Sequence, residues 1–179
     1  KINKNKTVLI HFPAEKGGRY TIPDGVSSIG DHAFIKCISL TSVTIPNSVT
    51  SIEDGAFRNC TSLKKINIPD SVTSIQDNTF RNCTSLSSIY IPNSITKIGN
   101  SAFRNCASLR KLYIPDSVIS ISVLALSNCS SLKSVTFLGD APKESYGVFL
   151  KTGLIIYRKP KAMGWGETWG QRPVKLIVE

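Results

Sequence analysis

The chain has 179 residues, of which 41% are hydrophobic and 19% charged, and these proportions exclude a disordered chain and favour one folded domain. Its net charge of +10 comes mainly from bases near the two ends, and no recognised nucleic-acid-binding motif accompanies them, so no nucleic-acid partner is expected. No apolar run reaches the ~18 residues of a membrane helix, so no membrane span is expected.

Residues 1–19 begin with "KINKNKTVLIHF", which has a basic start but neither an apolar leader nor a cleavage site. The first residue is Lys rather than Met, which favours a segment excised from a longer protein. We interpret residues 1–19 as a shortened N-terminal capping coil of the repeat described next. Only ten residues separate Pro13 from Pro23, so this coil is expected to lack its helix. In this coil, Ile10 and Phe12 are expected to align with Val43 and Ile45.

Residues 20–137 contain five copies of a 23-residue repeat. Proline, phenylalanine, leucine and isoleucine all recur at this step. The most distinctive column consists of the cysteines: Cys37, Cys60, Cys83, Cys106 and Cys129. One repeat cannot bury enough apolar surface to fold alone, so the constant period predicts a solenoid whose stacked coils share one core.

Each repeat predicts a strand followed by a short helix. Val43 and Ile45 alternate with polar residues, which indicates a strand, and Pro46 ends it. Further along, Ala56, Phe57 and Cys60 have the spacing of one helical face, with Asp54 placed as an N-cap. On that helix, arginines are expected to pair with the acid four residues earlier: Arg58 with Asp54 and Arg81 with Asp77.

The cysteine column allows four interpretations. A disulfide framework is disfavoured because the count is odd and equivalent side chains run parallel instead of meeting. A zinc site is disfavoured because there is no CxxC pair, and His11 and His32 match no ligand spacing. Nucleophilic catalysis would need one cysteine in a special setting. A ladder of reduced, buried core residues is the interpretation that fits five equivalent positions.

Residues 138–179 are interpreted as a degenerate sixth coil and a C-terminal cap. The sixth coil keeps Phe149 but has Thr152 where a cysteine is due. Trp165 and Trp169 follow in a glycine-rich run. They are expected to cover the last coil, and the alternative is a platform on which sugar rings stack.

The outward positions of the predicted sheet form the candidate binding surface. Neither of its two columns contains a carboxylate, and lysines and two tyrosines occur near the middle. A plain solvated face is the alternative to a basic surface that binds an anionic or amphipathic partner. The residues predicted to contact a ligand are Lys65, Asn67, Tyr90, Lys111 and Tyr113.

The repeat "LxxIxIPxSVTSIxxxAFRNCxS" resembles the BspA-type leucine-rich repeat, which also occurs in treponemal surface proteins. The resemblance covers about residues 20–137, and both flanks also resemble this family; Ser127 departs from the pattern by replacing an arginine. It implies an α/β leucine-rich-repeat solenoid over residues 1–179, with a parallel β-sheet on the concave face and short helices on the convex face. It also implies a cell-surface or secreted bacterial protein associated with adhesion.

Three functions remain open from the sequence. The first is a non-catalytic binding module, expected to be a monomer, whose partner is a host or matrix protein or an acidic glycan. The second is a structural spacer within a larger surface protein. The third is a glycan-processing enzyme, but that needs converging carboxylates, and the acids here recur with the repeat at turns. No cofactor, metal site or catalytic residue is expected.

Overall fold

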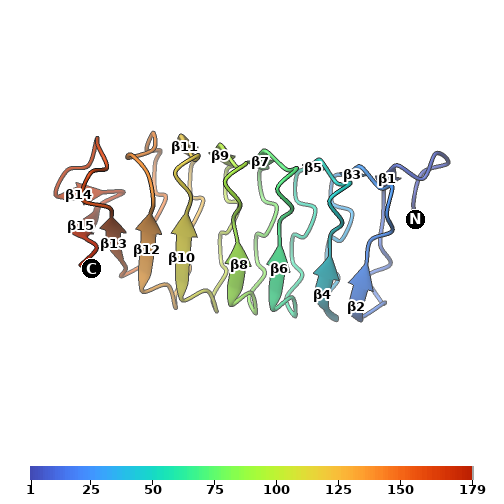
Figure 1. Ribbon diagram of the computed structural model, residues 1–179. Helices are drawn as coiled ribbons and strands as arrows, with labels where there is room; N and C mark the ends of the chain where they lie inside the picture. Colours follow the sequence, from blue (N-terminus) through green and yellow to red (C-terminus); the bar gives the residue numbers. More distant parts are fainter. Residues whose placement is uncertain (179) are drawn as a thin grey trace.

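The computed structural model describes residues 1–178 and shows an elongated solenoid whose coils stack along one axis (Figure 1). The two chain ends lie at opposite ends of the stack. Most coils contribute one strand to a main sheet, which faces the viewer in Figure 1 and consists of β2 (Gly18–Thr21), β4 (Leu40–Thr44), β6 (Lys65–Asn67), β8 (Ser88–Tyr90), β10 (Lys111–Ile114), β12 (Ser134–Phe137), β13 (Ile155–Arg158) and β15 (Arg172–Leu176).

Shorter strands form a second row, and each of them except the first follows the proline that ends a main strand. It consists of β1 (Val8–Leu9), β3 (Ser28–Ile29), β5 (Ser51–Ile52), β7 (Ser74–Ile75), β9 (Lys97–Ile98) and β11 (Ser120–Ile121). The one strand outside both rows, β14 (Thr168–Trp169), pairs antiparallel with β15. The strands within each row pair in parallel.

Neighbouring coils pair at the 23-residue step, so Ser42 lies opposite Lys65 and Lys65 opposite Ser88. Because parallel pairing at this step brings equivalent residues together, the sequence columns become rows along the solenoid axis. The main sheet is interrupted between β8 and β10, and the second row between β5 and β7. The predicted parallel-sheet solenoid is therefore present.

The core is built from the same columns. Neighbouring phenylalanine rings stack almost in parallel, with centroid distances of 4.8 Å for Phe34–Phe57, 5.6 Å for Phe57–Phe80 and 5.4 Å for Phe80–Phe103. Each such pair contributes roughly 0.5–1.5 kcal/mol beyond the area that it buries. All five cysteines are free and fully buried beside this stack.

The predicted short helices are wrong, because residues 1–178 contain no helix. The segment opposite the main sheet is a series of turns in which Gly55 and Asn59 both adopt left-handed φ values, of 57° and 63°. Alternate N–H groups bond within the coil and to the next coil: Arg58 N donates to Gly55 O, whereas Phe57 N donates to Thr79 O. A helix would use every N–H internally, and here half of them join neighbouring coils.

The expected ion pairs on this segment are also wrong. Without a helix, residues four apart do not share a face. The Asp54 carboxylate accepts a hydrogen bond from the Asn78 side chain at 3.3 Å, and the Asp77 carboxylate accepts one from Asn100 N at 2.7 Å. These acids therefore join neighbouring coils instead of capping helices. Because residues 1–178 contain no helix, they contain none long and apolar enough to cross a bilayer.

The first coil begins at a different point of the repeat from the one predicted. Leu9, not Ile10, enters the core, and it pairs with Ile29 in the second row. Phe12 then extends the phenylalanine stack, 5.1 Å from Phe34. The expected alignment of Ile10 and Phe12 with Val43 and Ile45 is therefore wrong. What the first coil lacks is a main strand, and His11 lies outside the main sheet.

The last coil is covered by aromatic side chains. Trp169 is 5% exposed and makes edge contacts with Phe137 and Phe149, at centroid distances of 5.3 and 5.6 Å. Trp165 packs on Phe137 at 4.8 Å. Both indole N–H groups donate to main-chain oxygens, Trp165 to Gly139 and Trp169 to Pro142. The ring faces of Trp169 are therefore committed to the protein interior.

Candidate binding surface on the main sheet

The outward side chains of the main sheet form two rows. In the first row Lys65 lies opposite Ser88 and Lys111 opposite Ser134. In the second row Asn67 lies opposite Tyr90. These rows exist because side chains alternate across a strand, so the apolar residue between two outward positions enters the core. Ile66, between Lys65 and Asn67, is only 2% exposed.

The structure brings the five predicted contact residues onto one face. Lys65, Asn67 and Lys111 are exposed, and Tyr90 and Tyr113 are 57% and 60% exposed. The two tyrosines occupy equivalent positions on β8 and β10, the two strands between which the sheet is interrupted. Tyr113 continues its row through Thr136 to Tyr157 on the following strands.

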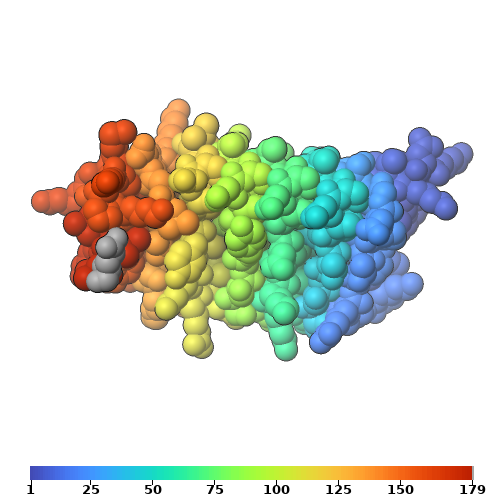
Figure 2. Space-filling view, viewed as in Figure 1, coloured from blue at the N-terminus to red at the C-terminus, as the bar shows by residue number. Residues whose placement is uncertain are grey.

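This face is basic because its outward positions from β2 to β12 include arginine and lysine but no carboxylate. Figure 2 shows it as a long surface without a deep cleft, with side chains projecting along its lower edge. Such a surface suits contact with an extended partner better than enclosure of a small molecule.

A shallow groove lies beside the face, close to where the strands begin. It has a volume of about 510 Å³ and is lined by Lys64, Ser85, Ser87, Ser108, Arg110 and Ser131. The residues that line this groove were not among those predicted to contact a ligand. Their signal was present in the sequence, because Ser85, Ser108 and Ser131 recur at the 23-residue step.

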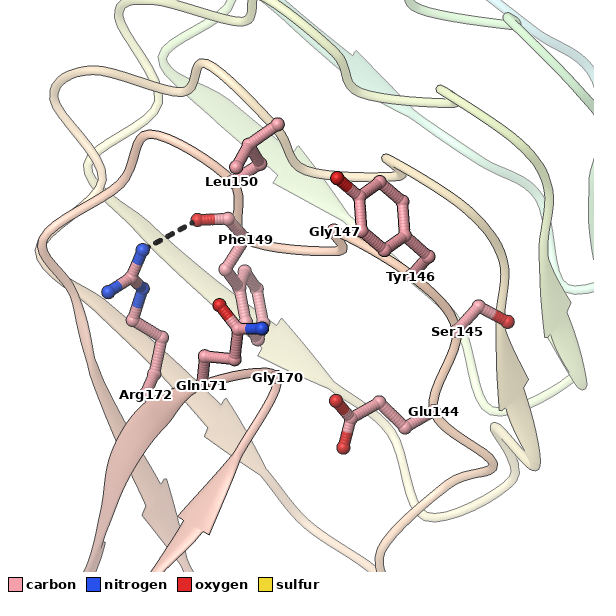
Figure 3. Close-up of a pocket in the computed structure, with 9 residues that line it drawn as sticks. All are labelled: Glu144, Ser145, Tyr146, Gly147, Phe149, Leu150, Gly170, Gln171 and Arg172. Atoms are coloured by element: carbon pink, nitrogen blue, oxygen red, sulfur yellow. Dashed lines mark hydrogen bonds between the residues drawn. The ribbon is translucent and has the colours of Figure 1, made fainter.

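A separate pocket of about 330 Å³ lies near the C-terminal end (Figure 3). Its wall includes Glu144, Tyr146 and Arg172, and Figure 3 shows the Arg172 guanidinium pointing toward the main-chain oxygen of Phe149, to which it donates at 3.1 Å. Glu144 is the only carboxylate in this wall. Within residues 1–178 no group of three or more His, Cys, Asp or Glu side chains is arranged to hold a metal.

The repeat itself identifies the family. The family model for the BspA type leucine rich repeat region matches residues 16–153 in six copies. The chain belongs to the BspA-type leucine-rich repeat family. The match extends beyond residues 20–137, which carried the resemblance in the sequence, and includes the sixth coil.

Solved structures of leucine-rich repeat proteins resemble this chain. A leucine-rich cell surface protein from Faecalibacterium prausnitzii A2-165 is 39% identical, with a TM-score of 0.73 over 76% of this chain and 37% of its own. A leucine-rich repeat protein from Bacteroides ovatus is 30% identical, with a TM-score of 0.69 over 87% of this chain and 45% of its own.

The leucine-rich repeat protein of T. pallidum is 28% identical, with a TM-score of 0.72 over 84% of each chain. The present BspA-type chain thus spans less than half of the first two relatives and most of the third. A comparison with curated protein sequences finds no match.

Proposed function

We propose that this chain is a non-catalytic binding module of a bacterial cell-surface or secreted protein. Its main sheet contacts an extracellular partner that presents acidic groups, either a host or matrix protein or an acidic glycan. The observation that carries the proposal is the exposure of Tyr90 and Tyr113 on a face with lysines and no carboxylate. The relative from Faecalibacterium prausnitzii is described as a cell surface protein, which supports the location.

The tyrosines and lysines on this face are expected to contribute to binding in different ways. Tyrosine offers a large, rigid contact area at a small cost in conformational entropy, and its hydroxyl adds a hydrogen bond. Lys65 and Lys111 attract acidic partners and speed their association, and this effect weakens as salt is added. Because the five side chains stand on paired strands, little ordering is needed on binding.

The test compares two charge-matched variants against extracellular-matrix proteins and sulfated glycans. One is Lys65→Glu/Tyr90→Ala/Lys111→Glu/Tyr113→Ala. The control is Lys97→Glu/Lys143→Glu/Tyr146→Ala, whose three positions are exposed and lie off the main sheet. We expect the first variant to lose at least tenfold in affinity while the control stays within about twofold of the parent. Equal binding by both variants would move the site off this face.

The two alternatives give different results in the same experiment. A structural spacer would bind none of these ligands. A glycan hydrolase would release sugar, and such enzymes use two carboxyl groups that flank the scissile bond. The pocket near the C-terminal end has one, Glu144. The protein is expected to be a monomer in this assay.

A further inference from the structure

Three arginines form a row on the turn segment opposite the main sheet. Arg58, Arg81 and Arg104 stand at equivalent positions of three consecutive coils. The backbone links them directly, because Asn59 N donates to Arg81 O and Asn82 N donates to Arg104 O, both at 2.8 Å. Strands or turns bonded in this way lie about 4.8 Å apart, so the row advances by about that distance per coil along the solenoid axis.

The Nε donors of this row lack the partners that buried donors usually have. The Nε atom of each of the three arginines is buried and has no hydrogen-bond acceptor. The side-chain bond that the row does make runs from Arg81 Nη1 to Asn78 Oδ1, at 3.4 Å. The nearby carboxylates are engaged elsewhere, since Asp54 accepts a hydrogen bond from Asn78 and Asp77 accepts one from Asn100. Most buried donors in native proteins are satisfied, so a repeated exception needs an explanation.

Like charges also accumulate here without a counter-charge. The pKa of Arg81 is lowered, first by burial and then by the positive charges of Arg58 and Arg104. A bound anion would relieve the repulsion between like charges, because it would neutralise the row and accept hydrogen bonds from the guanidinium groups.

The neighbouring asparagines keep the row regular. Asn82 donates to Asn59 at 2.6 Å, and Asn105 donates to Asn82 at 2.6 Å, through their side-chain amides. Each amide is thus engaged by the next amide in its own row. The coils are held at a constant spacing, and the arginines stand on a rigid support. A site held in this way is organised before its ligand arrives.

We propose that Arg58, Arg81 and Arg104 bind the sulfate groups of a linear sulfated glycan that lies along the solenoid axis. Guanidinium forks match the oxygens of tetrahedral anions and hold them with paired hydrogen bonds. Sulfates recur along one side of such a glycan, so a chain that lies along the axis can meet guanidinium groups on more than one coil. This site is distinct from the main-sheet surface, and it does not depend on the function proposed there.

The dimensions of the row disfavour other polyanions. The row ends at Ile35 on one side and Ser127 on the other, so it offers three charges. Duplex DNA is bound through broader basic surfaces, and single strands need aromatic platforms for their bases. An extended acidic peptide places same-side carboxylates about 6.6 Å apart, which does not match the coil spacing.

The test measures binding of a heparin-derived oligosaccharide and its desulfated counterpart by calorimetry. The variant Arg58→Gln/Arg81→Gln/Arg104→Gln is compared with Lys4→Gln/Lys97→Gln/Lys143→Gln, which removes the same charge at exposed sites elsewhere. We expect at least a tenfold loss for the arginine variant, less than a twofold loss for the lysine variant and no binding of the desulfated chain. Equal binding by both variants overturns the proposal.

Further arms keep the result decisive. Circular dichroism and the melting temperature show whether the triple variant is folded. If the triple variant is not folded, the single variant Arg81→Gln replaces it in the test, and its affinity for the sulfated chain is expected to fall about fivefold. Tighter binding of DNA or polyglutamate than of the sulfated chain also overturns the proposal. If the sheet variant Lys65→Glu/Tyr90→Ala/Lys111→Glu/Tyr113→Ala loses the sulfated chain and the arginine variant keeps it, this site fails and the main-sheet proposal stands.

Discussion

The thiol of Cys83 donates a hydrogen bond to the main-chain oxygen of Phe57, over 3.1 Å. Equivalent bonds from Cys106 and Cys129 reach the preceding coil in the same way, at 3.3 and 3.1 Å. The Phe57 oxygen also accepts a bond from Cys60 N, so the thiol of Cys83 adds a second bond to an oxygen that is already paired within its own coil. A small side chain with one weak donor suits this buried position. The cysteine column therefore joins coils through hydrogen bonds and not through disulfides.

The thiols are expected to be unreactive in the native protein. Burial raises the pKa of Cys83 and of Cys129 to about 12, so neither carries thiolate near pH 8. A chromogenic disulfide reagent should label all five thiols in guanidinium and none rapidly without it. Cys37, whose pKa is lowered by a hydrogen bond from Cys60, should react first as the pH is raised. Rapid labelling of several native thiols would contradict the buried ladder.

The same pKa shifts predict how stability depends on pH. Cys83 and Cys129 lose their protons more readily in the unfolded chain, where the pKa is about 8.5. Their contribution is therefore complete below about pH 8.5, and the free energy of unfolding falls as the pH rises from there toward 12. Urea unfolding across this range, for the parent and for Cys83→Ala/Cys129→Ala, measures the difference. A parallel decline in both proteins would show that other groups cause it.

Asn82 is expected to be sensitive to its backbone angle as well as to its side chain. Its φ is 62°, and its amide bonds both Asn59 and Asn105. Asn82→Gly should lose only the amide bonds, about 0.5–1.5 kcal/mol each. Asn82→Ala should lose a further 1–2 kcal/mol or so, because an L-residue with a Cβ is strained in this region. Equal stability of the two variants in urea would contradict the left-handed turn.

Arg81 is expected to cost stability rather than supply it. Its positive charge stands between those of Arg58 and Arg104. Arg81→Gln should raise the free energy of unfolding by about 0.5 kcal/mol or less at low salt, since partly exposed charges are screened by solvent. The gain should shrink in 0.5 M salt, with the Debye length then well below 10 Å. A large loss of stability at both salt concentrations would place Arg81 in a structural network.

Removal of the chain from Tyr157 onward is expected to cause aggregation. The truncation deletes Trp165 and Trp169 and exposes the aromatic side chains that they cover, Phe137 and Phe149. Exposed apolar ends of a solenoid associate with one another. Light scattering after size-exclusion chromatography measures the outcome, with full-length Trp169→Ala as the milder comparison. A monomeric truncation with unchanged stability would revive the sugar-platform interpretation.

The solenoid and its rows were predictable because a strict period leaves one way to stack the coils. Equivalent positions of neighbouring repeats, such as Lys65 and Ser88, are always 23 residues apart. Parallel pairing of the coils must therefore place them opposite one another, and the structure does so. The same logic identified the outward face. It could not reveal the interruption between β8 and β10, because both strands keep the same pattern, with an apolar residue, Ile89 or Leu112, between two outward positions.

The helices could not be excluded by apolar spacing alone. Ala56, Phe57 and Cys60 have a spacing that helices share with a series of tight turns. The contrary signal is the asparagine column that includes Asn59 and Asn82, since asparagine tolerates left-handed φ better than other residues with a Cβ. The misplaced first coil has a similar origin. Alternating apolar residues predict a strand near Leu9 but cannot tell which of two strand rows it joins.

The hydrogen bonds between coils give this protein a mechanical character. They run along the solenoid axis on the main sheet, in the second strand row and on the turn segment, so a pull on the two ends loads all the bonded layers of a junction together. The junctions between β5 and β7 and between β8 and β10 each lack the strand pairing of one layer. When a junction gives way, its coil of 23 residues is released as slack chain. Each release adds about 75–83 Å of contour length, so under tension the solenoid lengthens in equal steps and acts as an extensible tether.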